Sequence, residues 1–204
     1  MAAPGVERLG SRLREERERR GVSVRGLARE VGISASMVSQ IETGKAQPSV
    51  STLYAITTAL GITVEDVFTP AADNPTPSEW DEAVGSLRGQ RLGPLVRPAE
   101  RRVLQLDSGV TWELLGELPH QSVDFLKVTY APGGSSSSSG GLMRHPGSEY
   151  GHLLSGQLVL TLGFEDLLLT PGDSICFDST TPHRYRNEGS EPAVGVWFVI
   201  ERDR

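Results

Sequence analysis

The feature that most constrains the fold is a series of short amphipathic segments in the first third of the chain, each bounded by residues that favour helix ends. Apolar residues recur there three or four positions apart, which is the period of a helix with one buried face. Glycines that suit helix C-termini interrupt this pattern at Gly21, Gly32, Gly44 and Gly61. The spacing predicts five short helices in a compact all-α bundle over residues 1–68.

The pattern changes after residue 68. Residues 69–98 begin with TPAADNPTPSEW, which is rich in Pro, Asp and Asn, and they predict a linker. From about Arg101, short runs such as DFLKVTY, QLVLTLG and AVGVWFVIER alternate with turn residues and favour strands. We therefore expect a second, all-β domain over residues 99–204, built as a double-sheet jelly roll or a small barrel.

Two local features of the second domain have simple interpretations. The run from Ser135 to Ser139 is flanked by glycine pairs and predicts a flexible, solvated loop between strands. Cys176 lies between Ile175 and Phe177 and is interpreted as a buried apolar filler.

Charge is divided unevenly between the two domains. The net charge of the chain is −6, but the first 68 residues hold 9 Lys+Arg and 8 Asp+Glu, against 11 and 18 in the remainder. The first domain is therefore free to approach phosphates through a few placed groups. A single Cys excludes an intramolecular disulfide. Without a long apolar run, a cytoplasmic protein with no membrane partner is expected.

One long motif in the first domain matches a known DNA-binding pattern. It comprises Leu27-Ala28, Val31-Gly32-Ile33, Ser34, Gln40-Ile41-Glu42-Thr43-Gly44-Lys45, Pro48-Ser49 and Leu60-Gly61-Ile62. These positions resemble the phage repressor/Cro-type helix-turn-helix family, also called the XRE family, over about residues 8–68. The resemblance implies sequence-specific binding to double-stranded DNA.

The same resemblance implies which side chains meet DNA. The third helix enters the major groove, and Met37, Val38 and Ile41 are expected to face the core. Gln40 is the long side chain expected to read a base, typically adenine, through two hydrogen bonds. The full set of expected base and phosphate contacts is Ser23, Arg25, Ser34, Ala35, Ser36, Ser39, Gln40, Thr43 and Lys45.

One charged pair is assigned to structure rather than to DNA. Arg17 continues the apolar stripe of the first helix, so it points toward the bundle core. In the family an Arg of the first helix pairs with a Glu of the third, and Glu42 is the matching position. We expect Arg17 and Glu42 to form a largely buried ion pair.

A second motif set lies in the β domain. It comprises His145-x-x-x-Glu149, Gly156, Pro171-Gly172-Asp173, and Pro182-His183 followed by Asn187. These features resemble the cupin family over about residues 97–200. The resemblance implies a double-stranded β-helix (jelly-roll barrel) with His and Glu side chains inside it. Met143 stands where the first motif usually has a further His.

His145, Glu149 and His183 leave two interpretations open. They are the ligand set of a facial triad with open positions, which would hold a divalent metal such as Fe, Zn, Mn or Ni. They are equally the polar lining of an organic effector pocket. Tyr185 and Asn187 share the face of His183 by the two-residue period of a strand, and so lie nearby.

A helix-turn-helix domain followed by a cupin resembles a class of bacterial transcription regulators, in which the cupin senses a small effector and supports dimerisation. This implies a homodimer on a pseudo-palindromic operator and no catalytic residues. The alternative is a metal-dependent cupin oxidoreductase, because the layout also resembles the non-haem iron epoxidase that acts on hydroxypropylphosphonate. The polar row on the third helix favours the regulator.

Overall fold

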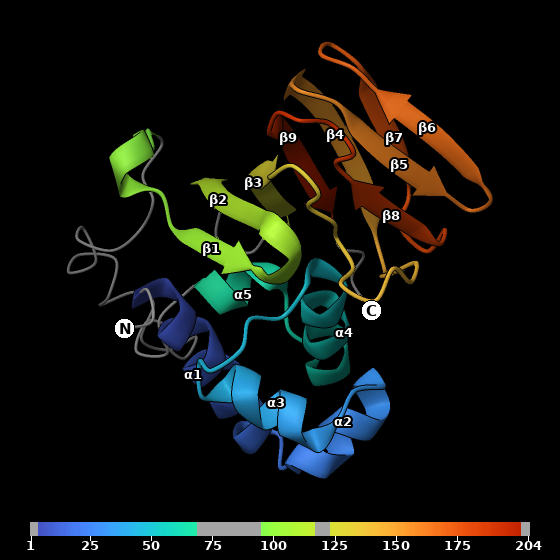
Figure 1. Cartoon of the computed structure of the whole chain (residues 1–204). Coiled ribbons are helices and arrows are strands. Elements are labelled where there is room, and N and C mark those ends of the chain that lie inside the picture. The colour runs from blue at the N-terminus through green and yellow to red at the C-terminus, as the bar shows by residue number, and fades with distance from the viewer. Residues whose placement is uncertain (1–3, 69–94, 117–122, 201–204) are drawn as a thin grey trace.

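The computed structural model describes residues 4–68, 95–116 and 123–200, with helices gathered in one part and strands in the other (Figure 1). The helices are α1 (Pro4–Arg19), α2 (Val24–Val31), α3 (Ala35–Glu42), α4 (Val50–Leu60) and α5 (Val64–Phe68). The sequence prediction of a five-helix N-terminal bundle is confirmed.

Local signals place the ends of these helices. Ser23, Ser34 and Ser49 begin α2, α3 and α4, and each side chain accepts a hydrogen bond from the backbone N–H three residues on. Gly32 and Gly61 end α2 and α4 with φ of 78° and 62°, a region that residues with a Cβ avoid. The turns between helices therefore follow directly from the sequence.

The bundle core draws on every helix, including Leu13, Leu27, Ile41 and Leu53, all of which are fully buried. Gly10 allows α1 to lie directly on the end of α3, because a Cβ at this position would sit 2.2 Å from the carbonyl oxygen of Ile41. This close contact with α1 fixes the C-terminal end of α3.

The rest of the described chain is a two-sheet β structure. Its strands are β1 (Val103–Leu106), β2 (Val110–Gly116), β3 (Val123–Tyr130), β4 (Ser148–Ser155), β5 (Leu158–Leu162), β6 (Glu165–Leu169), β7 (Ser174–Asp178), β8 (His183–Arg186) and β9 (Ala193–Ile200), with short 3₁₀ turns at Pro98–Glu100 and Asp107–Gly109. One antiparallel sheet has the order β1-β2-β3-β9-β4-β7 and the other the order β6-β5-β8. This is the double-sheet barrel that the sequence predicts.

The two-residue strand period decides what lies inside the barrel. Along β9, buried residues from Ala193 to Val199 alternate with half-buried or exposed ones, and along β3 buried and half-buried residues alternate. Gly156, at the turn between β4 and β5, has φ of 76°, and a Cβ there would lie 2.4 Å from the carbonyl oxygen of Pro192. Only glycine therefore lets β4 and β5 follow one another here.

Cys176 corrects one expectation. The residue is exposed on the outer side of β7, not buried. Ile175 and Phe177 are both half-buried and face the barrel, so the strand period turns the thiol between them outward.

The serine run corrects another expectation. Ser136 is fully buried and Ser137 nearly so, instead of forming a solvated loop. Ser136 N donates to Tyr185 O at 3.0 Å, and Tyr185 N donates to Ser136 Oγ at 3.1 Å. Ser136 thus bonds to both the N–H and the carbonyl of Tyr185 on β8, as a neighbouring strand would. The segment is therefore packed against the barrel despite its composition.

The bundle and the barrel are joined directly by α4. Ser51 N donates to Ser136 O and Asp107 N donates to Pro48 O, both at 2.9 Å. Figure 1 shows α4 standing between the α2–α3 pair and the strands. Most of the expected linker lies outside the described residues. Further contacts between the bundle and the strands are made where α1 meets β1 and α5 meets β3. No helix in the described part of the chain combines the length and apolarity needed to cross a membrane.

Candidate functional site

The outer face of α3 is polar, uncharged and open. Ser36, Ser39, Gln40 and Thr43 are all exposed, and Lys45 follows them in the turn after the helix. Gln40 Nε2 donates to Ser36 Oγ at 3.3 Å, one turn away on the same face. Short polar side chains beside one long amide are what a helix needs to meet base edges in a major groove.

The remaining expected DNA contacts lie around this face. The hydroxyls of Ser23 and Ser34 are occupied as helix caps, but both residues are exposed at helix N-termini, where backbone N–H groups suit phosphate oxygens. Arg25 is exposed in the first turn of α2. Ala35 is half-buried and packs against the bundle core, so little of it remains for a thymine methyl.

Met37 corrects the expected orientation of α3. Its side chain is 41% exposed, whereas Val38 and Ile41 are buried. At 100° per residue, the inward stripe is filled by Val38, Ile41 and Glu42, which leaves Met37 at its edge. Met37 therefore adds an apolar side chain to the exposed face that sequence reasoning missed.

The structure brings Arg17 and Glu42 together as a two-bond ion pair. Arg17 Nε donates to Glu42 Oε1 at 2.6 Å and Nη2 donates to Oε2 at 2.9 Å, while Nη1 donates to Val22 O at 2.8 Å. Both side chains are almost fully buried. The pair locks α3 against α1 and the turn that follows it.

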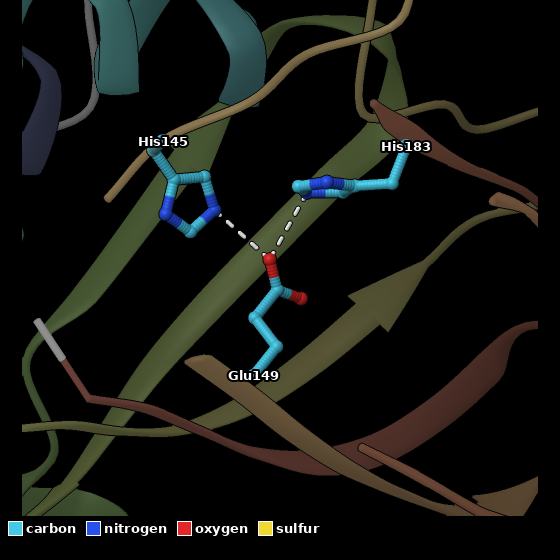
Figure 2. Close-up of side chains that lie close together, drawn as sticks. All are labelled: His145, Glu149 and His183. Atoms are coloured by element: carbon cyan, nitrogen blue, oxygen red, sulfur yellow. Dashed lines mark hydrogen bonds and ion pairs between the residues drawn. The ribbon is translucent and has the colours of Figure 1, made fainter. Parts of the chain in front are cut away.

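A second cluster lies inside the barrel. His145 precedes β4, Glu149 is on β4 and His183 begins β8, and Figure 2 shows the two imidazoles aimed at one carboxylate. Nε2 of His145 lies 2.9 Å and Nε2 of His183 lies 3.0 Å from Glu149 Oε1. All three side chains are buried. The structure therefore brings together the three ligands expected from widely spaced motifs.

Contacts of Nδ1 with backbone carbonyls fix the orientation of each imidazole ring. Nδ1 of His183 lies 2.8 Å from Thr181 O, and Nδ1 of His145 lies 3.3 Å from Pro146 O. A carbonyl only accepts, so Nδ1 carries a proton in both contacts, and Nε2 is the ring atom of each His that faces Glu149 and would bind a metal ion. The contact of His183 Nε2 with Glu149 lacks the alignment of a hydrogen bond, which leaves this buried nitrogen unsatisfied. Two imidazole nitrogens that converge on one carboxylate oxygen are a donor set that fits a divalent cation.

Glu149 is held as an anion. Burial raises the pKa of this carboxyl, but its interactions with His145 and His183 outweigh that effect and lower the pKa from 4.5 to about 2. Tyr185 Oη donates to Glu149 Oε2 at 2.8 Å, and Trp197 Nε1 donates to Tyr185 Oη at 3.2 Å. Burial raises the pKa of Tyr185 well above 10, so its phenol stays a donor. These bonds orient the carboxylate with Oε1 toward the imidazoles.

The other two expected neighbours play different parts. Met143 is buried, lines the barrel cavity, and pairs with His183 through two backbone hydrogen bonds of 2.8 Å. Asn187 is buried too, but its Nδ2 donates to the carbonyl oxygens of Tyr130 and Glu191 at 2.9 and 2.8 Å. Asn187 is thus committed to closing the turn before β9.

Sequence reasoning missed Tyr54, which reaches this site from α4. Its ring stacks on the imidazole of His145, with centroids 3.9 Å apart and planes 3° apart, and its centroid lies 5.8 Å from that of Trp112. The available signal was the composition of α4. Apolar residues, Val50 among them, extend around more of this helix than one core requires, which indicates a second packing partner.

Two family models match the chain. A helix-turn-helix domain matches residues 8–67, and a cupin domain matches residues 126–199. Together they cover more than half of the chain and confirm the predicted order of a helical bundle followed by a cupin barrel.

Similar proteins extend over nearly the whole chain. The HTH-type transcriptional regulator PuuR of Escherichia coli (strain K12) is 29% identical over 193 residues, which span 94% of this chain and 91% of PuuR. The solved structure of an HTH_3 family transcriptional regulator from Vibrio cholerae covers 97% of both chains, with a TM-score of 0.66 and 22% identity, and shows the same fold. The solved structure of a hydroxypropylphosphonic acid epoxidase from S. wedmorenis covers 96% of this chain and 98% of its own, with a lower TM-score of 0.45 and 19% identity.

The two domains, their order and the near full-length match agree with the resemblance found in the sequence. The chain belongs to the XRE-type helix-turn-helix transcriptional regulators that carry a C-terminal cupin domain.

Proposed function

We propose that the chain binds a pseudo-palindromic DNA operator as a homodimer, and that a small effector acts through the His145–Glu149–His183 site. The observation that carries the DNA-binding part is the open, uncharged row of Ser36, Ser39 and Gln40 on α3. The regulators PuuR and the Vibrio cholerae protein, which match this chain end to end, support the same function.

In this proposal α3 reads bases and its surroundings hold phosphates. Gln40 makes the bidentate base contact, and Met37 offers an apolar contact to a thymine methyl. Arg25 and Lys45 bind phosphates of the DNA backbone, since both are exposed beside the polar row of α3. Because the bundle carries almost no net charge, its affinity depends on these placed groups more than on a general attraction.

Selection of duplexes from a random pool by the full-length chain tests DNA binding. Enriched sequences should contain an inverted repeat with half-sites about 10 base pairs apart, or a multiple of that, since each protomer presents one α3. Enrichment of no sequence at low salt would remove the proposed function.

The outer face of the larger sheet is the proposed dimer contact. Tyr150 is 48% and Phe198 is 41% exposed, and they line a shallow hollow of about 380 Å³ together with Val196 and Cys176. No Asp, Glu, Lys or Arg is among the residues that line the hollow. Two copies of an otherwise acidic domain repel each other least where such an uncharged, apolar face meets its own copy.

A divalent metal is the proposed occupant of the triad. His145, Glu149 and His183 would hold it, and the ion would supply a Lewis-acid position at which a donor group of an effector could bind. Metal analysis of the purified chain and of Glu149→Gln tests this part, with about one equivalent expected in the parent chain and loss in the variant. Oxygen consumption by the iron-loaded chain would instead favour the oxidoreductase.

A further inference from the structure

One wall of the barrel site belongs to the DNA-binding domain. Val50 and Tyr54 of α4 line the same small cavity as Glu149 and Met143. The Tyr54 ring covers the face of His145 at a centroid distance of 3.9 Å. A helix of the bundle thus closes the candidate sensor site, as its place beside the strands in Figure 1 illustrates.

The space enclosed in this arrangement is very small. The cavity measures about 20 Å³, which is roughly the room that one water molecule requires. Pockets for organic ligands are typically about 300 Å³ or larger. A metal ion or a water fits behind Tyr54, but an organic effector does not unless one wall moves.

The wall that can move at least cost is α4. The strands around the cavity are paired along their length, since β9 pairs with both β3 and β4. At the mouth of the barrel, α4 and the turn before it are held by two backbone hydrogen bonds, from Ser51 to Ser136 and from Asp107 to Pro48, and by the Tyr54 stack. The bundle also contacts the strands where α1 meets β1 and α5 meets β3. Opening the sheets would break many more bonds than lifting α4.

We propose that α4 is the lid of the barrel, and that an organic effector enters by displacing Tyr54 from His145. This inference rests on the proposed function and names how its two sites are coupled. Leu53 of α4 and Ile41 of α3 are fully buried in one bundle core, so α3 moves with the lid. DNA and effector then bias the same two arrangements, and each changes the affinity of the other.

The cavity walls also indicate the class of effector. Of the three candidate metal ligands, Glu149 lines the cavity, and the other lining side chains are mostly aromatic and aliphatic, such as Trp112 and Leu126. The fitting ligand is a small organic molecule with one polar, metal-binding group and an apolar body.

A disulfide clamp on the lid tests the proposal without an identified effector. Ser51→Cys and Ser136→Cys are introduced into the full-length chain with Cys176→Ser, and Trp80→Phe leaves Trp112 and Trp197, which both line the cavity, as reporters. The measurement is quenching of their fluorescence by acrylamide, a probe larger than the cavity. Quenching should fall about threefold or more when the clamp is oxidised, and selected operator DNA should alter it only in the reduced form.

Equal quenching in the oxidised and reduced chains would overturn the lid. If the disulfide does not form, two variants at Tyr54 test the lid instead. Tyr54→Phe keeps the stacking ring and should retain the effect of DNA on quenching. Tyr54→Ala should lose this effect. Retention of the effect in both variants overturns the proposal. Absence of any DNA binding would contradict the proposed function. The comparison of quenching in the oxidised and reduced forms would still decide whether α4 is a lid.

Discussion

At the level of single residues, the Arg17–Glu42 pair determines how firmly the DNA-reading helix is held. Its two hydrogen bonds are short, and both groups are out of reach of solvent. Coulomb attraction in such a site offsets the loss of hydration only while both partners are present. The pair therefore matters more for the position of α3 than for net stability.

Removing one partner should cost about 3–5 kcal/mol of unfolding free energy, because the other charge stays buried without its two charged hydrogen bonds. Arg17→Met and Glu42→Leu are the single changes, and the double variant should be more stable than either. Urea unfolding measures all three. The exposed pair Arg14–Glu18 on the same helix is the matched control. Arg14→Met should cost much less than either single change, since Glu18 is in solvent and keeps its contact with Arg17. Single variants at Arg17 or Glu42 that match this control would contradict the assignment.

Glu149 should make part of the stability of the barrel sensitive to acid. Its pKa is about 2 in the folded chain against 4.5 ordinarily, so its contribution to stability is fully present above about pH 4.5 and is lost as the pH falls toward 2. In the metal-free chain, the difference in unfolding free energy between the parent and Glu149→Gln should shrink across this interval. Urea titrations at a series of pH values measure it, and a constant difference would contradict the role of Glu149.

At the level of elements, α3 and the turn after it separate two kinds of DNA contact. Gln40→Ala should cost about 1–3 kcal/mol on the selected operator and much less on random duplex, because it removes a base contact. Lys45→Ala should weaken both DNAs alike and reduce the salt slope by about one unit. Fluorescence anisotropy over a salt series distinguishes them. Equal losses on both DNAs for Gln40→Ala would exclude base reading.

The elements also show what the sequence can and cannot predict. Helix ends were predictable because serine caps and left-handed glycines act within a few residues, and the triad because the resemblance to the cupin family implies its members. Met37 was misplaced because the inward stripe of α3 is completed by Glu42, whose partner is on another helix. Ser136 was misplaced because its partners, Ser51 and Tyr185, are remote in the chain. Contacts of this kind leave no local signal.

At the level of the whole molecule, the uncharged outer sheet face should control assembly. Phe198→Glu places a charge in the centre of the proposed dimer contact and should weaken the dimer about tenfold or more, since burying an unpaired charge there is costly. Sedimentation equilibrium measures the dissociation constant. Phe164→Glu, at a fully exposed turn between β5 and β6, is the control and should assemble normally. A Phe198→Glu chain that dimerises like the parent would place the contact elsewhere.

The seating of α4 on the barrel has a consequence for the order in which the chain is made. At about 5–20 residues per second, the 85 residues from Leu60 to His145 take roughly 4–17 s to synthesise, and domains emerging first fold first. During that interval the nascent bundle has no barrel to cover Val50 and Tyr54, so these side chains are exposed on its surface. The bundle released without its barrel should therefore self-associate, and this stretch of synthesis is when a holding chaperone would matter most for the yield of native protein.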